Sequence, residues 1–378
     1  MNTNLSIRRS PSRYSLLLVL LLTLIGILGG CGGSTTAGPS HPSGATPTST
    51  PTRELKGTIS EFPLPSSIFW PTYITKGPDG NLWFNAGGTI GRITPTGVIR
   101  LFSIPTQRLV AAGITDGPDG NLWFSEELVP GGQSGKGKIG RITLSGTISE
   151  FSLSSNSNPG NITTGPDRAL WFDEYDINNK NYKIGRITTT GTISEFPLPF
   201  PPQTYLYGIT TGSDGNFWGI GYNGNNVPKG MIWRITPTGT ISAFPLPTAF
   251  FPSGSLIGII AGPDGNLWFG ESDSHSINGK IGRITPSGTI SEFPLPDHHN
   301  IVNDITAGPD GNLWFTESTD SHNDLTSQNG KIGRITASGT ITEFPVPTSN
   351  GTPWGITAGL DSTIWFTEIS SNKIGRLV

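Results

Sequence analysis

Residues 305–317 read ITAGPDGNLWFTE and residues 331–347 read KIGRITASGTITEFPVP. This pair of segments recurs along the chain with small changes, at intervals of 40 to 51 residues. A self-similar unit of this length is typical of a repeat architecture. Three markers occur once in each unit: the turn residues Asp79, Asp119, Asp167, Asp214, Asp264, Asp310 and Asp361, then Trp83, Trp123, Trp171, Trp218, Trp268, Trp314 and Trp365, then Arg92, Arg141, Arg186, Arg234, Arg283, Arg334 and Arg376.

Each unit predicts four short antiparallel strands. An Asp-Gly pair, which tolerates positive φ, joins the first strand to the second. A Ser-Gly or Thr-Gly turn joins the third strand to the fourth. Pro-x-Pro follows the fourth strand and cannot donate to a sheet ladder, which places it at an outer edge. Seven such units predict an all-β fold, a seven-bladed β-propeller with four antiparallel strands per blade.

The two ends of the repeat region complement each other. Residues 58–62 read TISEF, a fourth strand with no blade before it, and residues 373–378 form a third strand with no fourth after it. Pairing the two segments closes the ring and removes two exposed sheet edges. The repeated Trp and the Phe that follows it are predicted to be core. The repeated Arg is expected to lay its stem between blades and to reach carbonyls or a carboxylate.

The N-terminus is typical of an export signal. Arg8, Arg9 and Arg13 precede an apolar run of residues 16–28, which is too short to span a bilayer. Small residues then lead to Cys31, and this segment resembles the lipobox of bacterial lipoproteins. The resemblance implies cleavage before Cys31 and a diacylglycerol on its thiol. We therefore expect a signal peptide at 1–30, a flexible Gly/Ser/Thr/Pro tether at 31–54 and the propeller at 55–378, held outside the cytoplasm at a cell-envelope membrane.

Composition narrows the function further. The formal charge is −3 with 13% charged residues, so there is no basic footprint for nucleic acid. Cys31 is the one cysteine, which rules out an internal disulfide and a cysteine metal cluster in a monomer. With 52 Gly and 32 Pro, the chain favours tight turns over helices. We expect a monomer bound to the membrane through the lipid on Cys31.

Function is expected on one face of the ring. The loops between second and third strands and the connections between blades lie on this face, called here the variable face, and they differ most between repeats. In five blades a Glu ends the second strand there. Two hypotheses remain open for these carboxylates: a hard-cation site, with Glu317 and Glu271 as candidate ligands, or partners of the repeated Arg. The histidines of this face, candidates for a base or a metal ligand, are His275, His298, His299 and His322.

The motifs GPDGNLWFTE, NKIGRL and TEFPVP resemble the virginiamycin B (streptogramin B) lyase family over residues 55–378. The resemblance implies a seven-bladed propeller that linearises a cyclic depsipeptide by elimination across its ester C–O bond. It also implies a divalent metal, usually Mg²⁺, and a His as general base at the start of a first strand. The second-strand Glu of that blade is matched by Glu368. The seven positions equivalent to the base hold Thr72, Ala112, Gly160, Tyr207, Ile257, Asn303 and Trp354.

Two functions stay open at this stage. The first is a binding or interaction propeller, with Thr72, Tyr207, Asn303 and Trp354 as candidate contacts to a small-molecule, carbohydrate or protein ligand. The second is a Mg²⁺-dependent lyase that uses Glu368. A general base must reach the proton that it removes, and the inner position of that blade is Trp354 where the family has His.

Overall fold

The computed structural model describes part of the chain, and all described residues belong to the compact unit 51–378. None of them forms a helix long and apolar enough to cross a membrane. The signal peptide, Cys31 and the tether proposed from the sequence lie outside the described residues. These are residues 55, 57–67, 70–128, 135–198, 204–223, 230–247, 256–271, 279–297, 300–319 and 330–378.

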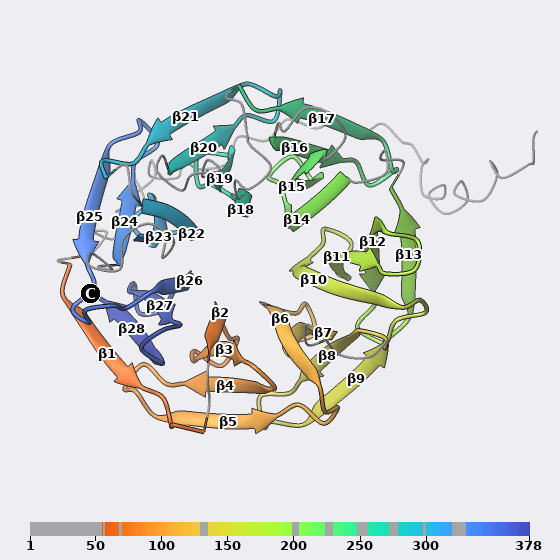
Figure 1. Cartoon of the computed structure of the whole chain (residues 1–378), viewed down its shortest axis with the longest axis horizontal. Coiled ribbons are helices and arrows are strands. Elements are labelled where there is room, and N and C mark those ends of the chain that lie inside the picture. Colours follow the sequence, from red (N-terminus) through yellow and green to blue (C-terminus); the bar gives the residue numbers. More distant parts are fainter. Residues whose placement is uncertain are drawn as a thin grey trace, which may run out of the picture. The chain divides into compact units, whose positions relative to one another are not determined.

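The described residues form 28 strands in seven four-stranded antiparallel sheets, numbered here as blades 1 to 7 (Figure 1). Blades 1 to 3 are β2 (Pro71–Lys76), β3 (Leu82–Ala86), β4 (Thr89–Ile93), β5 (Ile99–Ser103); β6 (Leu109–Asp116), β7 (Leu122–Leu128), β8 (Lys138–Ile142), β9 (Ile148–Ser152); and β10 (Ser157–Thr164), β11 (Leu170–Asp176), β12 (Asn181–Ile187), β13 (Ile193–Pro197).

Blades 4 to 7 continue in the same order. They are β14 (Thr204–Thr211), β15 (Phe217–Asn223), β16 (Gly230–Ile235), β17 (Ile241–Pro245); β18 (Leu256–Ala261), β19 (Leu267–Glu271), β20 (Lys280–Ile284), β21 (Ile290–Pro294); β22 (Asn300–Ala307), β23 (Leu313–Thr319), β24 (Lys331–Ile335), β25 (Ile341–Pro345); and β26 (Pro353–Ala358), β27 (Ile364–Glu368), β28 (Lys373–Leu377), completed by β1 (Ile59–Pro63).

The ring closes as the sequence predicts. The N-terminal strand β1 pairs antiparallel with β28, from Ile59 opposite Leu377 to Pro63 opposite Lys373. The first strands β2, β6, β10, β14, β18, β22 and β26 stand innermost, and each contacts the next around the full circle (Figure 1). Every blade therefore has a neighbour on both sides, and the first strands surround the central channel.

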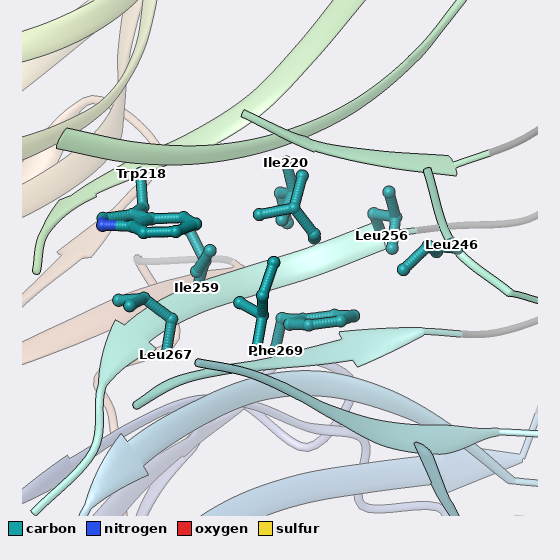
Figure 2. Close-up of a cluster of buried hydrophobic side chains, with 9 residues drawn as sticks. Trp218, Ile220, Leu246, Leu256, Ile259, Leu267 and Phe269 are labelled. Carbon is teal, nitrogen blue, oxygen red and sulfur yellow. The ribbon is translucent and has the colours of Figure 1, made fainter. Parts of the chain in front are cut away.

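The core lies between blades. Figure 2 shows Trp218 and Ile220 of blade 4 packed on Ile259, Leu267 and Phe269 of blade 5. Alternation along a strand sends successive side chains to opposite sides of the sheet, so each blade feeds two such clusters. The repeated Trp is fully buried in six blades, and Trp171 of blade 3 is half-buried. The predicted core residues are confirmed.

The turn Asp does more than permit a tight turn. In blade 2, Asp119 Oδ1 accepts a hydrogen bond from the Trp123 indole N–H at 2.9 Å. The guanidinium of Arg141 lies 5.7 Å from the Trp123 ring centroid and donates to Thr189 O of blade 3. The Arg therefore ties neighbouring blades together through a carbonyl, as expected, and its carboxylate neighbour is the turn Asp.

Candidate functional site

Each innermost strand is irregular where it meets the variable face. Its register against the second strand shifts, as between Pro71 and Ile74 in blade 1 and between Pro353 and Ile356 in blade 7. The same shift occurs in the other five blades. Such bulges re-aim side chains and are frequent near active sites. The seven inner positions singled out from the sequence lie inside the shift or, for Tyr207 and Ile257, at its edge.

A polar side chain of the second strand holds each of several bulges in place. In blade 7, Thr367 Oγ1 accepts from Gly355 N–H and donates to Thr72 O of blade 1. In blade 6, Thr316 Oγ1 donates to Trp354 O of blade 7. Ser125 makes the same pair of contacts in blade 2, to Gly113 N–H and Gly160 O. These side chains fix the backbone of the inner positions across blade boundaries.

Three of the predicted binding residues are brought together on blades 6, 7 and 1. Asn303 is buried, and its Nδ2 donates to Pro353 O, next to Trp354. The Thr72 hydroxyl donates to Asn85 Oδ1 at 2.8 Å. Trp354 is half-buried, and its side chain lies close enough to the Tyr73 hydroxyl to lower the pKa of that group. Tyr207, 41% exposed, stands on β14, across the ring from β26 (Figure 1).

Two carboxyls, Asp173 of blade 3 and Asp304 of blade 6, act electrostatically on Tyr73. Asp304 Oδ2 accepts from Ile356 N–H of blade 7, and Asp173 Oδ1 accepts from Asn161 N–H. Burial raises the pKa of both Asp173 and Asp304 to about 7, against these backbone hydrogen bonds. Burial also raises the pKa of Tyr73, with Asp304 and Asp173 adding to the effect. The inner part of the ring thus contains acidic groups, which the sequence analysis did not identify.

The second-strand Glu, the third-strand Lys and the fourth-strand Glu of a blade meet at the variable-face end of the sheet; we call them the Glu–Lys–Glu triad. Lys280 Nζ lies 3.4 Å from Glu271 Oε1 and 2.8 Å from Glu292 Oε2. The Lys is also within 4 Å of the second-strand Glu in blades 3 and 6. In blades 2 and 7 the two groups form no ion pair, but the charge of the Lys still lowers the pKa of the Glu. The partner of the repeated Glu is therefore this Lys, and not the repeated Arg. The triads are Glu126, Lys138, Glu150; Glu174, Lys183, Glu195; Glu271, Lys280, Glu292; Glu317, Lys331, Glu343; and Glu368, Lys373, Glu61.

Crowding of two carboxyls around one ammonium sets the charge of the triad. Burial raises the pKa of Glu317 to about 8, and the nearby Glu343 adds to this while Lys331 opposes it. Burial likewise raises the pKa of Glu368 to about 7, although Ser371 donates to its Oε2 at 2.6 Å. The folded state therefore holds the second-strand carboxyl at least partly protonated near pH 7, which lowers the negative charge of the triad.

The Mg²⁺ implied by the family resemblance needs several oxygen ligands around an open position. Glu271 and Glu317 each face a Lys instead. Among the described residues, no three His, Cys, Asp or Glu side chains gather to hold a metal. The part of the chain described here therefore does not offer Mg²⁺ a ligand set. All histidines lie outside the described residues.

The sequence analysis identified Tyr207 as a candidate binding residue but did not identify the tyrosines around it. Four further tyrosines, Tyr175, Tyr182, Tyr205 and Tyr222, join it in one cluster on blades 3 and 4. A signal was present, because five of the seven tyrosines of the chain fall within residues 175–222. Their convergence depends on strand pairing between and within blades, which the repeat alone does not show.

Comparison with known proteins agrees with this architecture. The model of the virginiamycin B lyase family matches residues 51–136, 131–326 and 325–378. A streptogramin B lyase structure is 34% identical, with a TM-score of 0.69, covering 85% of this chain and 97% of that one. A catalytically inactive histidine-to-alanine variant of virginiamycin B lyase from Staphylococcus aureus, crystallised with quinupristin, is 35% identical, with a TM-score of 0.68 and coverage of 85% and 99%.

A more distant likeness concerns the fold alone. A chain of the mitotic checkpoint complex is 13% identical, with a TM-score of 0.60, over 90% of this chain and 98% of that one. The family model spans the ring from its first strand to its last. The chain belongs to the virginiamycin B lyase family.

Proposed function

We propose that this protein is an exported, lipid-anchored member of the family that binds a ligand on the variable face, over the central channel, without opening streptogramin B antibiotics. One observation carries the proposal: the seven inner positions at the strand bulges are all described, and none holds a histidine. In blade 7 the position belongs to Trp354. An indole accepts no proton at neutral pH, so it cannot act there as a general base.

The same positions favour binding. Bulges fixed across blade boundaries hold their side chains in a defined geometry, which lowers the entropy cost of binding a ligand. Trp354 and Tyr207 are partly or well exposed on one face. Trp70, which precedes β2, is 69% exposed with a left-handed φ of 60°. Large exposed aromatic side chains over a rigid frame are suited to contact a small-molecule, carbohydrate or peptide ligand.

A Mg²⁺-dependent C–O lyase is the second candidate. Family membership and the match of Glu368 to the family position favour it. In this chain, however, the Glu368 carboxyl is fully buried and hydrogen-bonded to Ser371, next to Lys373 and Glu61. This environment of Glu368 resembles that of the Glu in the other triads, which favours a structural role for its carboxyl over a catalytic one.

The deciding experiment incubates the protein with quinupristin and Mg²⁺ and follows the antibiotic by mass spectrometry. We expect the antibiotic to stay cyclic, with and without a chelator. The Staphylococcus aureus lyase in the same buffer is the positive control. Elimination conserves mass, so ring opening is scored by chromatographic shift and fragmentation. Chelator-sensitive ring opening by the wild-type protein would overturn the proposal and establish the lyase.

The lipid anchor is tested separately. Growth of the natural or a bacterial expression host with a labelled fatty acid should mark the wild-type protein. The Cys31→Ser variant should carry no label and should leave the membrane fraction. Equal labelling of both proteins would contradict anchoring through Cys31.

A further inference from the structure

The five clustered tyrosines form a continuous aromatic surface across blades 3 and 4. Tyr175 is directly opposite Tyr182 in the sheet, with ring centroids 5.1 Å apart. Tyr205 is opposite Tyr222 at 4.6 Å. Tyr182 and Tyr205 join the two blades at 6.2 Å, and Tyr207 lies 5.9 Å from Tyr222. We call this set the tyrosine cluster.

The cluster belongs to the variable face. The second strand of each blade ends at this face, and the first and third strands begin there. All five tyrosines lie at these strand ends. Strands β10, β11 and β12 have eight, seven and seven residues, against six, five and five in β26, β27 and β28. The added length in blade 3 supplies Tyr175 and Tyr182. Four of the rings are half-buried and Tyr207 is exposed, so the cluster is accessible from solvent.

Acidic side chains lie near these rings, and they are negative in their ionised form. Tyr182 is electrostatically coupled to Asp173, and Tyr73 across the channel is coupled to Asp173, Asp304 and Glu127. No Lys or Arg in the described part of the chain contributes to the pKa of Asp304 or Glu127, and none forms an ion pair with them. Within the described residues, Asp304 and Glu127 therefore have no cationic side chain to neutralise their ionised form.

We propose that the tyrosine cluster, together with Asp173, binds an organic cation, with a quaternary or alkylated ammonium group against the tyrosine faces. The faces of aromatic rings carry negative potential and attract cations within about 6 Å of the ring centroid. A neighbouring carboxylate strengthens this preference. A neutral sugar would gain from stacking but not from the charge. The inference rests on the proposed binding function, because it names the ligand class of the same face.

The test uses choline chloride as the probe and the full-length protein in detergent, studied by isothermal titration calorimetry. The matched control ligand is 3,3-dimethyl-1-butanol, which has the shape of choline without its charge. We expect choline to bind at least about tenfold more tightly than the neutral isostere. Binding should weaken as the salt concentration rises, because the attraction is partly electrostatic.

Variants locate the site. Tyr207→Leu removes an exposed ring and should weaken choline binding at least about threefold. Asp173→Asn keeps an acceptor for the backbone N–H groups and should also weaken it, without affecting the neutral isostere. Leu360→Ala, a change at a 65% exposed residue in the turn between β26 and β27 on the opposite face, is the control and should leave binding unchanged. Circular dichroism checks that each variant folds.

Equal affinity for choline and its isostere, or no binding of choline, would overturn the inference. So would full choline affinity in both Tyr207→Leu and Asp173→Asn. These outcomes would not affect the proposed function. The quinupristin experiment tests that proposal separately, because it measures ring opening and does not depend on choline binding. Quinupristin turnover with tight choline binding would instead overturn the proposed function and keep the cation site.

Discussion

Blades 2, 3, 5, 6 and 7 carry a complete Glu–Lys–Glu triad, and blades 1 and 4 carry none of it. At the three triad positions blade 1 has Ala86, Thr89 and Leu101, and blade 4 has Gly221, Met231 and Ala243. The inter-blade core is the same in both groups, since Trp83 and Trp218 are buried like Trp268. The same blade structure therefore accepts either a charged triad or uncharged side chains at these three positions.

The three positions change together because a partial triad is unstable. Removing the Lys leaves two carboxyls facing each other away from water, whereas removing all three leaves an apolar site of acceptable energy. The repeated Glu is thus explained by its partners inside the blade. This comparison directs the search for function away from the repeated carboxylates and toward side chains that are unique to one blade, such as Trp354 and Tyr207.

The triad also positions the variable face. The fourth-strand Glu hydrogen-bonds the connection that arrives from the preceding blade: Glu150 accepts from Thr106 N–H and Oγ1, and Glu61 does the same for Thr348. Glu195 holds Ser154 in the same manner. In these blades the connections that lead into the inner strands are thus fixed by the triad, which couples blade stability to the geometry of the ligand face.

The largest effect is expected when one member of a triad is lost. Lys331→Met in blade 6 copies Met231 of blade 4 but leaves Glu317 and Glu343 without their cation. We expect a loss of about 2–4 kcal/mol in the free energy of unfolding at pH 7, measured by urea denaturation. The triple variant Glu317→Gly, Lys331→Met, Glu343→Ala, which copies all of blade 4, should recover most of this loss. A triple variant less stable than the single variant would contradict the interpretation that the three triad residues stabilise the fold only together.

A second prediction concerns pH. Glu126 has its folded pKa raised to about 8 by burial and by Glu150, so the folded state binds more protons than the unfolded state above about pH 4.5. Stability must then fall as pH rises from about 5 to 8, and Glu174, Glu271, Glu317 and Glu368 add to the trend. Glu126→Gln should flatten this slope and stabilise at pH 8 by on the order of 1–3 kcal/mol relative to the wild type.

The matched control for the pH experiment is Asp116→Asn, which changes an exposed carboxyl at the end of β6. Thermal unfolding from pH 5 to 8 should show the wild-type slope for this variant. Wild-type stability that rises over this range would contradict the buried, protonated carboxyls. Below about pH 4 the sign reverses: burial alone would raise the pKa of Glu61, but hydrogen bonds from Lys373 and Thr348 lower it, and protonation then removes its stabilising contribution.

The smallest effect is expected at the connections. Thr348→Val keeps the shape of the side chain and removes the hydroxyl that donates to Glu61 at 2.6 Å and accepts from Lys373. We expect a loss of about 1–2 kcal/mol in the free energy of unfolding. Thr96→Val, in an exposed turn of blade 1 that has no triad, should cost less. Equal losses in the two variants would show that the hydrogen bonds of Thr348 to Glu61 and Lys373 add nothing to stability.

Prediction from the sequence succeeded where the determining interactions are local. The Asp-Gly turns at Asp79 and Asp310, the period-two pattern of LWF and the unmatched end segments at 58–62 and 373–378 define strands, blade number and closure. The site was harder to predict. The role of the Glu368 carboxyl depends on Ser371, Lys373 and Glu61, and the last of these lies about 300 residues away in sequence.

The sequence by itself therefore determined the ring, its seven blades and the strand that closes it, because turn chemistry and alternation act between residues close in the chain. Only the tertiary structure decided that Lys, and not Arg, meets the repeated Glu, that inner strands bulge at the channel, and that five tyrosines and Asp173 converge. Those features depend on strand register and on which side chains meet within and between blades. The residues that meet are from seven positions apart, as in Tyr175 and Tyr182, to about 300 apart, as in Thr72 and Thr367, and no repeat pattern specifies these pairings.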